Sequence, residues 1–242
     1  GIKQWFRGRD DHASFEIVVH DGLIYFYLDC PRRWRGFIEQ QIHAQYPYAQ
    51  IEEMLDYNIF SEHSAIVGAY LVSKEHHSFP LKTYKNMDSD PISGMLNALS
   101  KIEEGNSSAA IQFVVRSAHK SWRHRGVHIV RDVKKGKRFE SVAKKSGFAR
   151  AMSATGETLG EIVSTKKKDD LGKSKEDDYK LSAMEEEMLK GIEGKLSKGG
   201  MEVTIRLLSV SNSEQKARLH LDNIMNSFSQ YNLYRYGNSF QA

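Results

Sequence analysis

Cysteine is almost absent from this sequence of 242 residues, and no apolar stretch in it is long enough to cross a bilayer. The single cysteine, Cys30, cannot form an internal disulfide and has no second cysteine for a CxxC metal or redox pair, which indicates a reducing compartment. The longest strand-like apolar segment, 65–72, falls well short of the roughly 18 to 20 residues of a membrane-spanning helix. The sequence therefore predicts no membrane span within these residues.

A phosphate-binding loop is also missing. That motif needs a glycine, four further residues and then Gly-Lys-Ser/Thr, because the backbone N–H groups of the loop cradle the phosphates. The chain has Gly172-Lys173-Ser174, but Lys167 occupies the place of the first glycine and no strand pattern precedes it. We therefore expect no nucleotide site, no other cofactor, no metal and no enzymatic activity in these residues.

The overall composition excludes two further classes. With 40% hydrophobic and 27% charged residues the chain has an ordinary globular composition, which argues against a fibrous repeat or a wholly disordered protein. Lys and Arg (35) exceed Asp and Glu (31) by only four, so any attraction to phosphate must come from local clusters of charge. We expect a folded protein with a sizeable core.

Residues 15–117 alternate between strand and helix patterns. Asp21-Gly22 separates two strand-like runs and predicts a hairpin, because glycine readily adopts the positive φ of a tight turn. Pro31 and Pro91 each open a helical stripe. From residue 23 the expected order is strand, helix, strand, strand, helix, strand, with the strands at 23–28, 49–55, 65–72 and 110–116. This order is typical of a ferredoxin-like (split βαβ) unit.

Residues 118–200 have a different character, because their pattern is helical and strongly charged. Within them, 164–180 has 11 charged residues out of 17 and one large aliphatic, Leu171, so a mobile loop is expected. Residues 201–242 return to the sheet as a strand, a helix capped by Ser211 and Glu214, and a last strand at 232–242. The partner of that last strand is expected to lie outside the chain.

The predicted fold class is therefore α+β, with tandem ferredoxin-like (split βαβ) units, antiparallel sheets and an inserted charged helical segment. The boundaries follow the change from alternating apolar patterns to charged helical ones and back. The expected divisions are a leader at 1–14, an α+β unit at 15–117, the basic insertion at 118–200, and a strand and helix at 201–242 that complete a second unit.

The insertion carries a dense cluster of positive charge. Between 116 and 150, twelve basic residues stand against two acidic ones, a local charge of +10. Such a cluster suits nucleic-acid phosphate, anionic lipid, an acidic protein surface, or plain solvation with no ligand, and interleaved aromatic rings could stack on bases. The candidate binding residues are Lys120, Trp122, Arg123, Arg125, Arg131, Lys134, Lys135, Lys137 and Arg138.

Aromatic residues gather near the end of the chain. They exceed what the preceding helix and strand are expected to bury, and exposed aromatic clusters tend to mark interfaces. We therefore predict that they pack against another domain or subunit. The interface candidates are Phe228, Tyr231, Tyr234, Tyr236 and Phe240.

Three stretches, 26–53, 90–116 and 204–232, resemble the region before the nucleotide-binding domain in bacterial conjugative-transfer (type IV secretion) ATPases, of the coupling-protein class. The resemblance covers most of the chain except the charged insertion, and its motifs are those of a scaffold. It implies a non-catalytic assembly and docking region that positions a membrane-associated motor, while a later domain handles ATP.

The resemblance also implies partners and a location. The partners are the downstream ATPase domain, other secretion-system subunits, DNA and further copies of the chain. The location is the cytoplasm, at the inner face of the cell membrane. The alternative hypothesis is a stand-alone nucleic-acid-binding α+β protein that uses the basic segment 116–150.

Overall fold

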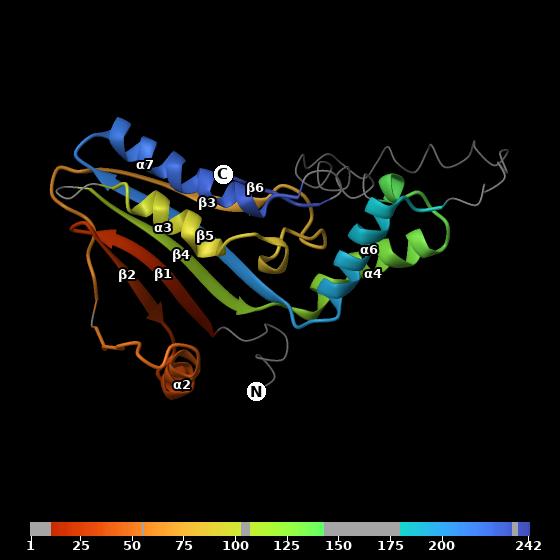
Figure 1. Ribbon diagram of the computed structural model, residues 1–242, viewed down its shortest axis with the longest axis horizontal. Coiled ribbons are helices and arrows are strands. Elements are labelled where there is room, and N and C mark those ends of the chain that lie inside the picture. Colours follow the sequence, from red (N-terminus) through yellow and green to blue (C-terminus); the bar gives the residue numbers. More distant parts are fainter. Residues whose placement is uncertain (1–10, 55, 103–106, 143–179, 234–236) are drawn as a thin grey trace, which may run out of the picture.

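The computed structural model describes residues 11–54, 56–102, 107–142, 180–233 and 237–242. Its strands form one six-stranded antiparallel sheet in the order β2-β1-β4-β5-β3-β6 (Figure 1). The strands are β1 His12–His20, β2 Leu23–Asp29, β3 Ala65–Ser73, β4 Ser108–Ser117, β5 Met201–Ser211 and β6 Phe240–Gln241. Together with the helices, this sheet confirms the α+β class.

Five α-helices have defined bounds, and none of the described helices is long and apolar enough to span a membrane. They are α2 Arg35–Gln45, α3 Pro91–Leu99, α4 His124–Lys134, α6 Ala183–Leu196 and α7 Glu214–Ser227, with short 3-10 helices η1 Arg32–Trp34, η2 Tyr84–Asn86, η3 Lys120–Arg123 and η4 Phe228–Tyr231. Helices α3 and α7 lie side by side on one face of the sheet, whereas α4 and α6 project beyond one end of it (Figure 1).

The strand order does not confirm the expectation of two tandem units. Strands β3 and β4 both run antiparallel to β5, which lies between them, and α3 connects them, so one split βαβ pairing is present within a single sheet. The expected strand at 49–55 is not formed in its described part, 49–54. Residues 51–54 are all exposed, so this segment has no buried face to hold it on a sheet.

Local turn and cap signals in the first half of the chain are confirmed. Asp21 and Gly22 both have positive φ, 50° and 73°, as a two-residue hairpin turn between β1 and β2 requires. At the start of α3, the carboxylate of Asp90 accepts a hydrogen bond from the backbone N–H of Ile92 at 3.0 Å, and Pro91 occupies the first turn. Helix α7, by contrast, is capped by Ser213 and not by Ser211, because it begins two residues later than the motif predicts.

The main core lies between the sheet and the helices α3 and α7. Its fully buried members include Leu99 of α3, Ile111 of β4, Leu207 of β5 and Ile224 of α7. Alternate residues of each strand enter this core, as the alternating pattern of β5 predicts. The opposite face of the sheet is only partly covered, by the segment around Ile59.

The end of the chain packs against this same core, which corrects the predicted interface. Phe228 is 2% exposed, and its ring lies 5.9 Å from Phe240 and 6.0 Å from Tyr231. Strand β6 pairs with β3 inside the chain, so its partner does not lie outside it. Three of the five predicted interface aromatics are therefore part of the core or packed on it, and Tyr234 and Tyr236 lie outside the described residues.

Residues 118–142 and 180–200 form a helical arm between β4 and β5. The arm leaves and rejoins the sheet at adjacent points, where the N–H of Ala118 donates to the carbonyl of Gly200 at 3.0 Å. Helices α4 and α6 share a small core of their own with Phe79, a residue of the segment after β3. The described parts of the arm are mainly helical, and all but Lys180 of the predicted loop 164–180 lies outside the described residues.

Candidate functional site

The predicted basic residues all lie on the helical arm. Lys120, Trp122 and Arg123 belong to η3 at its base, Arg125, Arg131 and Lys134 to α4, and Lys135, Lys137 and Arg138 to the turn that follows. Helix α6 packs beside them and brings acidic residues that the segment 116–150 lacks. Across 118–142 and 180–200, twelve basic residues stand against six acidic ones, so the net charge of the described arm is +6.

Several of these cations are neutralised by neighbours. The Lys134 ammonium lies 2.5 Å from a carboxylate oxygen of Glu193 on α6. Lys137 lies 3.0 Å from Asp132, and the hydrogen bond from this ammonium holds the pKa of the Asp132 carboxyl below its ordinary value. Arg131 lies 3.9 Å from the same aspartate, so this contact is a weak one.

Trp122 and Arg123 join the arm to the sheet and so have a structural role. A Cβ atom on Gly200 would come within 2.1 Å of the indole nitrogen of Trp122, so this glycine lets the ring lie close to the backbone just before β5. One terminal nitrogen of Arg123 donates to the carbonyl of Lys198 at 2.5 Å, and its guanidinium lies 5.4 Å from the Trp122 ring. Burial lowers the pKa of Arg125.

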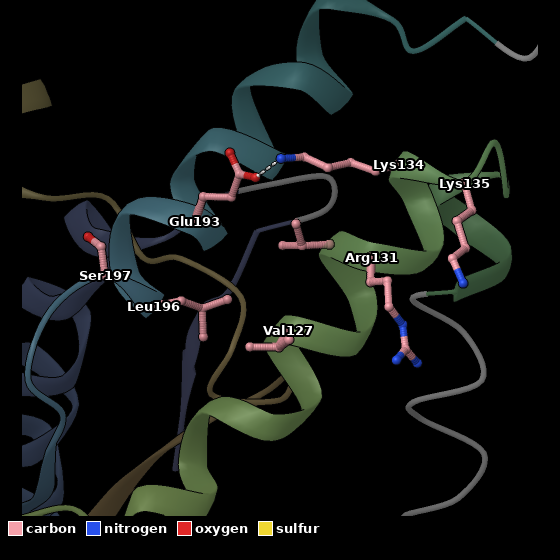
Figure 2. Close-up of a pocket in the computed structure, with 8 residues that line it drawn as sticks. Val127, Arg131, Lys134, Lys135, Glu193, Leu196 and Ser197 are labelled. Atoms are coloured by element: carbon pink, nitrogen blue, oxygen red, sulfur yellow. Dashed lines mark ion pairs between the residues drawn. The ribbon is translucent and has the colours of Figure 1, made fainter.

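A groove of about 680 Å³ opens between α4 and α6 (Figure 2). Its apolar lining consists of Val127, Val130 and Leu196, and the side chains of Val127 and Leu196 point toward one another across the gap. The remaining lining residues are Arg131, Lys134, Lys135, Glu193 and Ser197. This α4–α6 groove therefore combines an apolar floor with a rim that is mainly basic.

Glycine and the spacing of apolar residues explain how the groove forms. A Cβ atom on Gly126 would come within 2.7 Å of Leu196, so a glycine here permits α4 to approach α6 closely. Gly126, Ile129 and Val133 are buried and form the stripe that α4 turns toward the arm's core. Val127 lies one position outside this stripe and is 51% exposed, which leaves it available to a ligand.

The groove brings together three of the nine predicted residues, namely Arg131, Lys134 and Lys135. Its apolar floor and Glu193 were not predicted, although an apolar residue beside the buried stripe of α4 is a signal that the sequence does contain. Of the aromatic rings interleaved with these cations, Phe139 is fully buried and Trp122 is packed on Gly200, whereas His124 is exposed. The site therefore fits an amphipathic ligand better than a row of bases.

A second polar cluster lies on the other face of the sheet, around the buried carboxylate of Glu16 on β1. Glu16 accepts hydrogen bonds from Ser14 at 2.7 Å, from the amide of Gln112 at 2.8 Å and from the hydroxyl of Tyr57. Burial alone would raise the pKa of Glu16, but these three hydrogen bonds and nearby Arg206 outweigh it and hold the pKa below 4.5.

The same contact acts on Tyr57 in the opposite sense. Burial first, and then the hydrogen bond to Glu16, raise the pKa of the Tyr57 hydroxyl well above 10.0. The Tyr57 ring also stacks on Tyr27 of β2, with the ring centroids 4.4 Å apart. The cluster thus fastens the segment after α2 to the open face of the sheet, and we assign it a structural role.

The fold and the groove define an α+β protein built on a single open sheet, with a helical arm that carries a groove between α4 and α6. Residues 3–242 match the family model described as a domain of unknown function, DUF8128, and the chain belongs to that family. Comparison with curated proteins gives no match, and neither does comparison with solved structures.

Proposed function

We propose that this protein is a non-catalytic docking region whose α4–α6 groove binds an acidic, amphipathic segment of a protein partner. The observation that supports the proposal is the pairing of an apolar floor at Val127, Val130 and Leu196 with cations at Arg131 and Lys135. For Lys135 no ion pair with a carboxylate occurs among the described residues. An amphipathic segment that buries apolar side chains on the floor would place its carboxylates near these cations.

The size of the groove sets the expected affinity. Full burial of two apolar side chains contributes about 3 to 6 kcal/mol, and each exposed ion pair at the rim adds about 0.2 to 1 kcal/mol. Association also costs translational and rotational freedom. Set against that cost, the gain supports a dissociation constant of roughly millimolar or weaker for a single groove, which suits a contact that works together with others in an assembly.

The resemblance to the region before the motor in type IV secretion ATPases gives this proposal a setting. In that setting the protein positions a downstream ATPase domain among the other secretion-system subunits, at the inner face of the cell membrane. Reading the gene past the codon for Ala242 tests the setting. A phosphate-binding loop shortly downstream would support it, and a stop codon at that point would count against it.

The second candidate function is nucleic-acid binding by the arm, and the net charge of +6 favours it. Against it stand the ion pair of Lys134 with Glu193 and the burial of Phe139, which remove one cation and one stacking ring. A surface that binds phosphate mainly by charge loses affinity steeply as salt concentration rises, whereas the apolar part of a peptide interaction does not.

One set of titrations separates the two functions. The probes are a short synthetic peptide in which Leu and Glu alternate, a matched peptide of Leu and Lys, and oligothymidylate, each followed by fluorescence anisotropy at low and moderate salt. We expect only the acidic peptide to bind, among the three probes. We expect Val127→Asp to abolish that binding. Leu219→Asp on α7 is the matched control, because Leu219 is 58% exposed and lies far from the groove in sequence and fold.

The opposite result would be equally clear. Tight, strongly salt-dependent binding of oligothymidylate, with none of the acidic peptide, would replace the docking function by nucleic-acid binding. Equal loss of peptide binding in Val127→Asp and Leu219→Asp would show that the peptide does not use the groove.

A further inference from the structure

Helix α2 and the segment after it form an acidic lobe, defined as residues 36–56. The lobe contains the carboxylates of Glu39, Glu52, Glu53 and Asp56 and no lysine or arginine. Arg35, at its boundary, lies 2.7 Å from Glu39 and 2.5 Å from Glu53, which leaves the other two carboxylates without an ion pair among the described residues. The lobe is therefore negative where the helical arm is positive.

The acidic lobe also exposes large apolar side chains. Helix α2 has no buried residue, which is unusual for a helix of a folded protein, because a helix is normally stabilised by burial of one face. The exposed side chains are Phe37 (66%), Tyr46 (69%), Tyr48 (100%), Ile51 (39%) and Met54 (57%). A cluster of this kind on one segment is typical of an interaction surface.

The segment 46–54 has the chemistry that the α4–α6 groove requires. Its residues have no helix or strand structure after the turn at Pro47, and Ile51, Glu52, Glu53 and Met54 are all exposed. Two apolar side chains flank two carboxylates in this stretch. The two apolar side chains suit the apolar floor of the groove. The two carboxylates equal in number the two rim cations, Arg131 and Lys135.

We propose that the α4–α6 groove of one molecule binds the segment 46–54 of a second copy of this chain. This inference rests on the proposed docking function and names the partner of that site. Charge complementarity supports it, since the arm has a net charge of +6 and the lobe has four carboxylates with no lysine or arginine of its own. Ile51 and Met54 would occupy the floor, and Glu52 would face Arg131 and Lys135.

The positions of the two surfaces decide the geometry of association. The acidic lobe hangs from the β2 side of the sheet, whereas the arm extends from β4 and β5, and the two stand apart in Figure 1. Each molecule therefore offers one lobe and one groove in different places, so the contact joins two different surfaces. Two copies that make this contact reciprocally form a twofold dimer, and copies that make it in one direction form a closed ring or an open filament.

Sedimentation velocity over a range of protein concentrations tests this inference on the whole chain. The groove variant is Arg131→Glu with Lys135→Glu, and the lobe variant is Glu52→Lys with Met54→Ser. The control is Lys180→Glu with Lys190→Glu, which makes the same change of charge on exposed arm residues that do not line the groove. Wild type and control should form species larger than a monomer, and higher salt should reduce them.

The two variants should fail separately and succeed as a pair. Each alone should associate roughly tenfold or more weakly than wild type, because the groove variant reverses two rim charges, whereas the lobe variant reverses one charge and removes one apolar side chain. An equal mixture of the groove variant and the lobe variant should recover association, because the intact lobe of the first fits the intact groove of the second, and the two reversed surfaces attract one another as well.

Other outcomes would overturn the inference. If wild type stays monomeric at all concentrations while the Leu-Glu peptide still binds, the second copy is the wrong partner and the docking function stands. If neither association nor peptide binding occurs, both proposals fail. If the groove variant associates as wild type does, the contact between copies lies elsewhere and the inference is wrong.

Discussion

Replacement of Tyr57 by phenylalanine isolates the hydrogen bond that fastens the segment after α2 to the sheet. The Tyr57→Phe variant keeps the ring and its stacking on Tyr27 but removes the hydroxyl that donates to the carboxylate of Glu16. A hydrogen bond to a charged group contributes about 1.5 to 3 kcal/mol. Glu16 keeps its bonds from Ser14 and Gln112, so we expect a loss near the lower end, about 1.5 to 2 kcal/mol.

The dependence on pH gives this prediction its sharpest form. The pKa of Glu16 is lower in the folded protein than its ordinary value of 4.5, so the stabilisation is complete above that pH. It is lost as the pH falls through the lower, folded-state pKa, where the carboxylate becomes protonated. The cost of Tyr57→Phe should therefore be largest near neutral pH and should shrink below about pH 4.5.

Urea unfolding at several pH values, followed by circular dichroism, measures both effects. Thermal unfolding at neutral pH should in addition show a melting temperature lower by roughly 3 to 8 °C. The matched control is Tyr25→Phe, because Tyr25 stacks on Tyr27 at 5.9 Å but its hydroxyl has no hydrogen bond within the part of the chain that the structure describes. A cost for Tyr57→Phe that equals the control, or that stays constant from neutral to acid pH, would refute the assignment.

Two further substitutions test the main core and the N-terminal cap of α6. Leu99→Ala should destabilise the protein by about 2 to 5 kcal/mol in urea unfolding, because Leu99, the last residue of α3, is fully buried in the main core, whereas Leu219→Ala at an exposed position of α7 should cost little; similar costs would contradict the described core. Ser182→Ala should cost about 1 kcal/mol and speed amide hydrogen exchange in the first turn of α6, because it removes the capping box with Glu185; unchanged exchange in that turn would argue against this cap.

Local features of the fold could be predicted from the sequence because their causes are local. The turn at Asp21-Gly22 depends on two residues, and the start of α3 depends on Asp90 and Pro91. The apolar stripe of α6 also follows from spacing within one helix. In each case the residues that determine the local structure lie within that structure and close together in the sequence.

Non-local pairing could not be predicted in the same way. The segment 49–55 has the composition of a strand, but its described residues find no place on the sheet, and Tyr57 from the following segment packs there instead. Glu16 and Tyr57 are 41 positions apart, and nothing in either neighbourhood indicates their contact. For the same reason β6 was expected to need an outside partner, whereas β3 provides the pairing.

The sequence indicates the basic residues of the candidate site but not its apolar floor. The density of basic residues on α4 is visible in the sequence, and Arg131, Lys134 and Lys135 do line the groove. The floor forms only when Leu196 of α6 lies beside Val127 of α4. Packing of two helices that are distant in the sequence is therefore required. Charge from α6 also lowers the positive charge that the segment 116–150 displays by itself.

The hydrogen bond between Ala118 and Gly200 marks a junction of arm and sheet at which changes in the length of the arm should be tolerated. The two ends of the arm lie at adjacent residues, and pairing of β4 with β5 already holds these ends together. This pairing offsets most of the entropic cost of closing the long segment between the two strands. Helices there can be lengthened, shortened or exchanged without shifting the register of β4 and β5. A relative could thus retune its binding specificity by replacing this one segment while its scaffold stays the same.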